Sequence, residues 1–345
     1  MIPCNLTFMM IRYNYPLRKH NTFGIAARTR RYISLASVKE ATDLLTQEEL
    51  DTDNCLVLGG GSNILFTKDF SGTIIHPLFD NIATEEIVSD NAIISAEAGL
   101  EWDRLVEWTV RNNLGGLENL SFIPGNVGAA PIQNIGAYGT EVSNLITGVH
   151  AISIESAEYR FFSSEECMFG YRNSIFKNEL KGKYLITKVE FSLRRSPEAF
   201  NLSYGNLEQI VRNKGEITLR CIREAVIQIR KEKLPNPSVT GNAGSFFKNP
   251  VIDVNKYAEL KKEYQDIPSW QTGDGNYKIP AAWLIEQSGW KGKKAGRAGV
   301  HKKHALVLVN LGNANGSEIL ELSNMIIESV QNIFGIKLIR EVNVI

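Results

Sequence analysis

One serine of the chain has neighbours that could direct its hydroxyl into a partly dry cavity. In the segment GNAGSFFKNP, residues 241–250, Ser245 follows Gly244 and precedes Phe246 and Phe247. A serine nucleophile needs a base, usually histidine. No G-x-S-x-G elbow surrounds this serine, and the chain has only five histidines, at positions 20, 76, 150, 301 and 304. We therefore expect this hydroxyl to do something other than attack as a nucleophile.

Two glycine-rich segments could hold a phosphate or a pyrophosphate. They read GGGSN at 59–63 and PGNVGAAPIQNIGAYG at 124–139, and no charged residue occurs from Asn119 to Thr140. Glycine allows positive φ angles and lets backbone N–H groups converge on an anion without a lysine. Neither segment is a Walker A or a G-x-G-x-x-G sequence. Spacing alone therefore fits tight turns in a buried loop as well as a cofactor site.

The elements that would position these loops follow from hydrophobic periodicity and from glycine and proline. A helical stripe that stops at Gly115–Gly116 predicts a helix at 101–116, and a second stripe predicts one at 317–335, with Ser317 as N-cap and Gly335 beyond its end. The stripe residues are Trp102, Leu105, Val106, Thr109 and Val110 in the first helix, and Leu322, Met325, Ile326, Val330 and Ile333 in the second. Further helices are predicted at 217–234 and at 280–289, the latter with Pro280 as its first residue. Strands are predicted within 55–66, 92–99, 147–154, 184–194, 304–312 and 336–345.

Composition limits the class of protein. The 345 residues are 43% apolar and 22% charged, as in ordinary globular proteins, and the 38 basic side chains balance the 38 acidic ones. Zero net charge removes the usual electrostatic footprint of a nucleic-acid-binding protein. No apolar run is long enough to span a membrane, and the N-terminus does not resemble a signal peptide; Met9 or Met10 could be the true start. The four cysteines, at 4, 55, 167 and 221, are far apart, which predicts reduced thiols and no metal site.

Eight short stretches, from residue 21 to the end of the chain, match the motifs of one protein family in order. They are NTFGIAA (21–27), LGGGSNILF (58–66), GLENLSFIPGNVGAAPIQNIGAYG (116–139), FGYRNSIFK (169–177), KLPNPSVTGNAGSFFKNP (233–250), AAWLIEQSG (281–289), AGVHKKHALVLVN (298–310) and REV (340–342). Through them the chain resembles the UDP-N-acetylenolpyruvylglucosamine reductase (MurB) family, flavoenzymes of peptidoglycan synthesis. The first twenty residues lie outside the resemblance.

The resemblance implies an α+β fold: an FAD-binding fold of the PCMH (vanillyl-alcohol-oxidase) type, with two subdomains, followed by a C-terminal α/β substrate-binding domain. We expect an N-terminal extension at 1–20, the FAD-binding domain at 21–197, and the substrate-binding domain at 198–345, with its last strand returning toward the flavin. Pro197, in a polar segment, favours that boundary. The resemblance also implies non-covalent FAD, NADPH as co-substrate, and UDP-N-acetylglucosamine enolpyruvate as substrate. We expect a monomer in the cytoplasm that binds no nucleic acid, no membrane and no metal.

Three catalytic residues carry over from the family's pattern. Hydride transfer from flavin N5 to C3 of the enolpyruvyl group leaves negative charge at C2 and its carboxylate, which the protein must stabilise and protonate. The resemblance assigns Arg172 to the carboxylate, Ser245 to protonation of C2, and Glu341 to a hydrogen bond with the carboxylate as it becomes enolate-like. The protonation state of Glu341 is left open. The implied FAD-binding residues are Gly59, Gly60, Gly61, Ser62, Asn63, Pro124, Gly125, Gly128, Gln133, Asn134, Gly136, Ala137 and Tyr138.

The substrate-binding residues that carry over are Tyr138, Tyr204, Lys233, Asn249, Trp270 and His304. The segment SWQTGDGNYKIP (269–280) matches the longer form of the family, whose mobile loop closes over the nucleotide; Trp270 takes the place of the usual tyrosine near the loop tip. His304 replaces a common glutamine and either contacts the nucleotide or begins a strand.

Two other functions remain open. One is another flavin oxidoreductase of the same fold, such as an aldonolactone oxidase that uses oxygen and often a covalent flavin; the motifs at 241–250 and 298–310 disfavour it because they belong to the substrate domain. The other is a non-catalytic nucleotide-sugar-binding protein, which the intact Arg172, Ser245 and Glu341 disfavour.

Overall fold

The computed structural model describes residues 9–48, 50–197 and 199–345. The chain forms two compact units, each assembled from segments that are far apart in sequence. The first unit contains the chain up to Tyr15, Thr29–Gly60 and Ser71–Glu232; the second contains Pro16–Arg28, Gly61–Phe70 and Lys233–Ile345. This division differs from the expected boundaries, because residues 199–232 belong to the first unit and two short N-terminal segments belong to the second.

The largest sheet of the first unit has the strand order β12-β11-β13-β7-β6, with β8 also paired to β13. These strands are β6 (Ile82–Val88), β7 (Asn91–Glu97), β8 (Leu114–Gly115), β11 (Ile146–Ser153), β12 (Tyr159–Ser163) and β13 (Tyr184–Arg195). The central strand β13 is antiparallel to both β11 and β7. The strands predicted within 92–99, 147–154 and 184–194 are confirmed.

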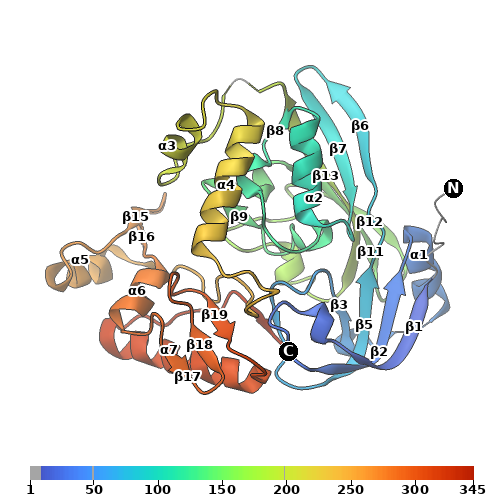
Figure 1. The fold of residues 1–345 in the computed structure, drawn as a ribbon. Coiled ribbons are helices and arrows are strands. Elements are labelled where there is room, and N and C mark those ends of the chain that lie inside the picture. Colours follow the sequence, from blue (N-terminus) through green and yellow to red (C-terminus); the bar gives the residue numbers. More distant parts are fainter. Residues whose placement is uncertain (1–8, 49, 198) are drawn as a thin grey trace. The chain divides into compact units, whose positions relative to one another are not determined.

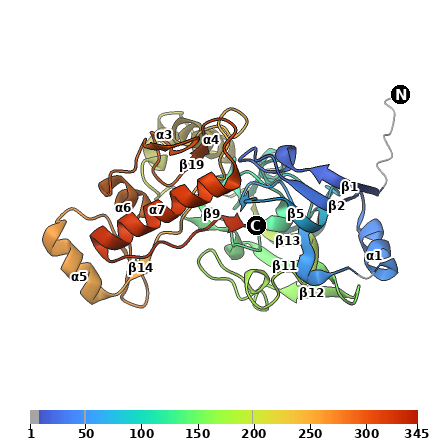
Figure 2. The same ribbon diagram turned by 90° about the horizontal axis from the view of Figure 1, so that it is seen from below.

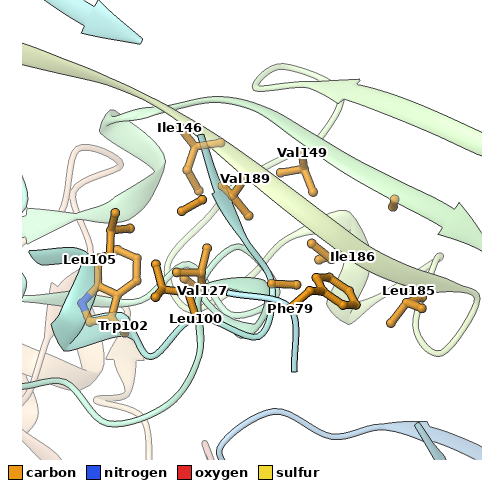
Figure 3. Packing of buried hydrophobic residues seen from close by; sticks show 14 of the residues in the cluster. Phe79, Leu100, Trp102, Leu105, Val127, Ile146, Val149, Leu185, Ile186 and Val189 are labelled. Atoms are coloured by element: carbon orange, nitrogen blue, oxygen red, sulfur yellow. The ribbon is translucent and has the colours of Figure 1, made fainter. Parts of the chain in front are cut away.

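Helix α2 (Trp102–Arg111) packs against this sheet and begins the segment that leads to the second glycine-rich loop (Figure 1). Figure 3 shows Trp102 and Leu105 beside Val127, within one buried cluster. The Trp102 indole N–H donates to the Leu120 carbonyl at 2.9 Å, so the core fixes the start of the loop as well as the helix. The predicted helix is confirmed but ends earlier than expected. Gly115 is not a helix cap, because it lies in β8, where it pairs with Arg194 of β13.

A second sheet contains β1 (Met10–Pro16), β2 (Arg28–Leu35), β5 (Phe70–Pro77) and β3 (Cys55–Val57), in the order β1-β2-β5-β3. Helix α1 (Val38–Gln47) follows β2. Residues 10–16 of the expected N-terminal extension therefore form a strand of a sheet. The rest of the expected extension before Met9, including Cys4, lies outside the described residues.

Helices α3 (Leu207–Arg212) and α4 (Leu219–Lys233) complete the first unit. Both oxygens of Asp103 in α2 accept hydrogen bonds from Arg223 in α4, at 2.6 and 2.8 Å, and both side chains are largely buried. Such a bidentate, charge-assisted pair fixes orientation as well as distance. It explains why α4, the helix predicted at 217–234, belongs to the first unit.

The second unit holds three small sheets. They are β14-β16-β15 (Val251–Ile252, Tyr277–Lys278, Trp270–Gln271), β17-β18-β19 (Lys294–Ala295, Ala298–Val300, Leu308–Asn310), and a parallel pair of β4 (Ile64–Leu65) with β20 (Asn343–Val344). The segment predicted as one strand at 336–345 thus contains a regular strand only at its end. The predictions within 55–66 and 304–312 are confirmed by β3, β4 and β19.

Three helices accompany these sheets: α5 (Val254–Glu263), α6 (Ala281–Gln287) and α7 (Gly316–Phe334). Figures 1 and 2 show α6 beside α7. The predicted helices are confirmed, with corrected caps. Pro280 is the N-cap of α6; Asn315 caps α7 and forms a capping box with Glu318, while Ser317 donates to the Thr67 carbonyl at 3.2 Å. Two predicted stripe residues of α7, Met325 and Ile333, are exposed.

Two further properties of the described residues bear on function. No helix in these ranges has the length and apolar character needed to cross a membrane. Cys55, Cys167 and Cys221 are free thiols. Burial raises the pKa of Cys167 to about 12, so this thiol stays protonated at neutral pH.

Candidate functional site

The two glycine-rich segments meet within the first unit. A Cβ atom on Gly60 would lie 2.8 Å from Asn126 Oδ1 and 3.1 Å from the Cα of Gly125, so the backbones approach too closely for a larger residue. Gly125 has a φ of 117°, in the region that favours glycine. Two segments about sixty residues apart thus form one surface of backbone and amide groups.

The backbone after Gly125 is held to the segment before α2. The N–H groups of Val127 and Gly128 donate to the carbonyls of Leu100 and Ala98 at 2.9 and 3.0 Å. A Cβ on Gly128 would lie 2.7 Å from the Cβ of Ala98. Gly128 is therefore required for packing, whatever else it contacts. Pro124, Gln133 and Ala137 lie along the same segment of the first unit.

Asn134 organises the turn that leads to Arg172. Its side chain is fully buried; Nδ2 donates to Glu141 Oε2 at 2.9 Å and to the Gly170 carbonyl at 3.0 Å, and Oδ1 accepts from the Ser143 N–H at 3.0 Å. Both the nitrogen and the oxygen of the Asn134 side-chain amide are therefore hydrogen-bonded within the protein. The structure therefore gives Asn134 a positioning role, which the sequence did not indicate.

Arg172 is oriented by backbone carbonyls of the second glycine-rich segment. Its guanidinium donates to the Asn134 carbonyl at 3.3 Å and to the Gly136 carbonyl, and it lies 5.6 Å from the ring centre of Tyr171. A Cβ on Gly136 would lie 2.8 Å from Arg172 Nη1. The glycine thus makes room for the guanidinium.

Three residues in the same part of the first unit have a left-handed backbone. Asn134, Tyr138 and Arg172 have φ angles of 45°, 48° and 53°. Residues other than glycine adopt this left-handed backbone conformation at a cost of about 1–3 kcal/mol each. Such residues are common at functional sites. Three of them in contacting segments mark this region as a candidate site.

Tyr138 and Tyr204, both predicted to bind substrate, form an edge-to-face pair with ring centres 5.6 Å apart. Burial raises the pKa of Tyr138 above its usual value, although the positive charge of Arg230 in α4 and a hydrogen bond from it oppose that shift. Arg230 also donates to the Phe122 carbonyl at 3.0 Å. Sequence analysis missed Arg230, because only the packing of α4 distinguishes it from the other basic residues of that helix.

In the second unit, Ser245 lies on an extended segment paired on both sides. Ser245 forms a β-bridge with Val307, and the Phe246 N–H donates to the Leu306 carbonyl at 2.8 Å. Phe246 and Phe247 are buried, as expected for residues that exclude water. A Cβ on Gly241 would lie 2.2 Å from the Phe23 carbonyl oxygen. The first glycine of the motif thus permits a close backbone approach to Phe23.

Glu341 lies on the segment that pairs with the residues after Ser245. The Glu341 N–H donates to the Phe246 carbonyl at 2.8 Å, and Arg340 bridges to Phe247. Asn63 Nδ2 donates to the Glu341 carbonyl at 3.3 Å. The second unit therefore brings Ser245, Glu341 and Asn63 into one neighbourhood. Of the first glycine-rich loop, Gly61 and Ser62 also belong to this unit.

The other predicted substrate residues have identifiable places. Asn249 Oδ1 accepts from the Ala281 N–H at 2.9 Å, at the start of α6, and Lys233 is the last residue of α4. His304 Nδ1 accepts from the Leu306 N–H at 3.3 Å, in the turn before β19. The regular strand β19 begins only at Leu308, so His304 does not begin it, and its contact with the nucleotide stays a prediction.

Trp270 lies in β15 and pairs with Lys278, two residues before the hairpin turn at 272–276. Asp274 and Gly275 supply the turn chemistry. The position is consistent with the expectation that Trp270 lies near the loop tip, and its contact with the nucleotide stays a prediction. Its side chain is 51% exposed.

Two family models match the chain. Residues 31–158 match an FAD binding domain, and residues 236–345 match the C-terminal domain of UDP-N-acetylenolpyruvoylglucosamine reductase. These matches confirm the expected fold class, an FAD-binding domain of the PCMH type followed by a distinct C-terminal domain.

The chain is also similar over nearly its whole length to curated reductases. It is 45% identical to the UDP-N-acetylenolpyruvoylglucosamine reductase of Flavobacterium johnsoniae, over 98% of the chain and 100% of that relative. It is 44% identical to the enzyme of the same name from Porphyromonas gingivalis, with the same coverage. The crystal structure of the Thermus caldophilus reductase (MurB) matches at 24% identity with a TM-score of 0.67, over 98% of this chain and 99% of that one, which supports the fold.

Proposed function

The chain belongs to the UDP-N-acetylenolpyruvoylglucosamine reductase family, and from this premise we propose that it reduces UDP-N-acetylglucosamine enolpyruvate to UDP-N-acetylmuramate with NADPH and FAD, a step of peptidoglycan biosynthesis. One observation carries the proposal. The segment containing Glu341 pairs with Phe246 and Phe247, directly after Ser245, so a carboxyl group and a hydroxyl lie on neighbouring backbone segments of the second unit.

The glycine-rich segments fit FAD. Gly59, Gly60 and Gly125, with the Asn126 amide, form a surface of backbone and amide groups, and the segment from Asn119 to Thr140 carries no charge. Backbone N–H groups in such loops favour the pyrophosphate, and neutral walls favour the flavin ring. When bound, FAD would accept electrons from NADPH and deliver a hydride to C3 of the substrate.

Arg172 would bind the enolpyruvyl carboxylate. Its guanidinium is oriented by two backbone carbonyls, and a planar guanidinium matches the geometry of a carboxylate. The charge that develops on the carboxylate during reduction strengthens this contact in the transition state. Arginine keeps its positive charge at every working pH.

Ser245 would donate its proton to C2, where carbanion character develops. The resulting alkoxide would regain a proton from solvent. Glu341 would hydrogen-bond the substrate carboxylate, and its backbone is held by Phe246 and Asn63 so that little reorganisation is needed. The buried Phe246 and Phe247 limit water near the reacting carbon.

We assign Tyr138, Tyr204, Lys233, Asn249, Trp270 and His304 to binding of the nucleotide. The chain would act as a cytoplasmic monomer, and the FAD-binding and substrate-binding functions would follow the two matched ranges, 31–158 and 236–345.

The proposal is tested by following the flavin absorbance through two half-reactions in the absence of oxygen. NADPH should bleach the bound flavin, and UDP-N-acetylglucosamine enolpyruvate should restore its colour. If colour returns only with oxygen, the chain acts like an aldonolactone oxidase. If NADPH does not bleach the flavin, a non-catalytic nucleotide-sugar-binding protein is the better description.

A further inference from the structure

Tyr204 lies in the connection between β13 and α3, where Phe200 and Leu202 pack against the apolar cluster of α3 and α4. The ring is 48% exposed, and the next residue, Gly205, has a φ of 59°. An exposed aromatic residue next to a glycine has many accessible orientations, so a residue that must bind a ligand needs support from elsewhere.

Asn119 provides such support from inside the first unit. Its side chain is 1% exposed, and its Nδ2 donates to the Tyr138 carbonyl at 2.9 Å and to the Asn201 carbonyl at 2.8 Å. Asn201 Nδ2 donates back to the Gly139 carbonyl at 3.0 Å. Three hydrogen bonds therefore join residues 138–139 to residue 201; we call this set the Asn119 bridge.

The chemistry of the bridge requires an amide at position 119. Two carbonyl oxygens accept from one nitrogen, and only a side chain with two N–H groups on a planar nitrogen can satisfy both from this place. The opposite amide orientation would put Oδ1 against two acceptors. In the observed orientation Oδ1 is buried and has no hydrogen-bond partner among the described residues. The two donor contacts thus determine how Asn119 lies.

The bridge extends to Tyr204 through short steps. Ser203 Oγ donates to Asn201 Oδ1 at 2.9 Å, and the Leu207 N–H donates to the Tyr204 carbonyl at 3.2 Å, at the start of α3. The Tyr204 ring then meets the Tyr138 ring edge to face. Both ends of the short segment that carries Tyr204 are fixed, one by the bridge and one by the helix.

We propose that Asn119 is a positioning residue for substrate: through the Asn119 bridge it holds Tyr204 against Tyr138 in the orientation that binds the nucleotide. The inference rests on the proposed function, in which Tyr204 contacts the nucleotide. Preorganisation of a binding group lowers the ordering cost of association. The bridge should therefore act on substrate affinity and leave the chemical steps unchanged.

The test compares KM for UDP-N-acetylglucosamine enolpyruvate, kcat, and the rate of flavin bleaching by NADPH. Asn119→Ala should raise KM about tenfold, the effect of roughly one net hydrogen bond, with kcat and bleaching nearly unchanged. Asn201→Ala, at an exposed position, should raise KM in the same direction, and it serves if Asn119→Ala folds poorly. Asn113→Gly is the matched control: it removes the 3.0 Å contact with Ser196 at the other end of the connection and should leave KM unchanged.

A double-mutant cycle with Tyr204→Ala separates positioning from general support of the fold. Asn201→Ala should raise KM in the native background and should add nothing when Tyr204 is already Ala. An equal rise in both backgrounds, or no rise in the native one, overturns the inference. If Tyr204→Ala itself leaves KM unchanged while the native protein turns over the substrate, the inference fails and the proposed function stands. A native protein that does not turn over the nucleotide contradicts the proposed function itself.

Discussion

In the proposed mechanism, the Ser245 hydroxyl acts without a base that activates it. Ser245 forms an isolated bridge with Val307, and the nearby His304 ring accepts from the Leu306 N–H. A serine hydroxyl is a weak acid in water, yet a carbanionic carbon is basic enough to take its proton. The neighbouring backbone would then stabilise the alkoxide until a proton returns.

We predict that Ser245→Ala slows the reaction of reduced flavin with the enolpyruvyl substrate by about 10²–10⁴-fold, the usual contribution of a general acid. Flavin bleaching by NADPH should be nearly unchanged. Ser245→Cys should recover part of the lost rate, because a thiol can still donate a proton. Stopped-flow absorbance measures both half-reactions, with Ser238→Ala, an exposed serine of the same unit, as the control. Equal damage to both half-reactions would identify Ser245 as a structural residue.

In the role proposed for Arg172, the shape of the cation would matter as much as its charge. We predict that Arg172→Lys lowers turnover more than tenfold, since a point charge without the planar fork holds a carboxylate but does not orient it. NADPH bleaching should change little. The matched control is Arg160→Lys, an exposed arginine of the same unit paired with Glu166 at 3.1 Å. Normal turnover in the Arg172 variant would remove this residue from the mechanism.

At the scale of elements, periodicity predicted where helices lie better than where they begin and end. The apolar stripe located α7, but the choice between Ser317 and Asn315 as its cap depends on a tertiary contact, since the Ser317 hydroxyl is used by Thr67. The segment 336–345 alternates buried and exposed residues as expected, yet it pairs through an isolated bridge at Arg340 and becomes a regular strand only at Asn343.

The residues of the candidate site also fall into two groups, those that the sequence alone indicates and those that only the structure indicates. Residues inside recognisable motifs, such as Ser245 and Arg172, could be named from sequence. Asn119 and Arg230 could not, because an asparagine in an uncharged loop and one more arginine on a helix have no distinctive spacing. Their roles arise from packing: Asn119 is buried between two carbonyls, and Arg230 reaches Tyr138 once α4 is fixed to α2 by Arg223.

The capping of α7 gives a prediction about stability. Asn315→Ala removes the acceptor for the Glu318 N–H at 2.9 Å and disrupts the capping box. We expect the free energy of unfolding to fall by about 1 kcal/mol, the usual cost of losing an N-cap. Urea denaturation measures it. Ser317→Ala is the control and should cost less, within about 0.5 kcal/mol. If Ser317→Ala lowers the free energy of unfolding more than Asn315→Ala does, Ser317 is the N-cap, as the sequence predicted.

At the scale of the whole molecule, the cofactor should be held by many weak backbone contacts and no covalent bond. We predict that purified protein is yellow and that acid denaturation releases the flavin into the supernatant. The reason is the neutral, glycine-rich surface formed by Gly60 and Gly125, which offers no nucleophile for attachment. Absorbance of the supernatant and pellet checks this. Flavin that remains with the precipitated chain would contradict it and favour the oxidase alternative.

The interleaving of the two units has a consequence for how the protein is made. β4, at Ile64–Leu65, pairs with β20, at Asn343–Val344, and the Thr67 N–H donates to the Ile345 carbonyl at 2.8 Å. On the ribosome, the strand containing Ile64 therefore emerges long before its partner, whereas the first unit is complete once Glu232 has been synthesised. Contacts this distant in sequence form slowly, because a long loop must close before any pairing compensates for it. Until then, Phe23 and Phe66, both fully buried in the finished protein, stay exposed on the nascent chain, where chaperones that bind apolar segments would protect them.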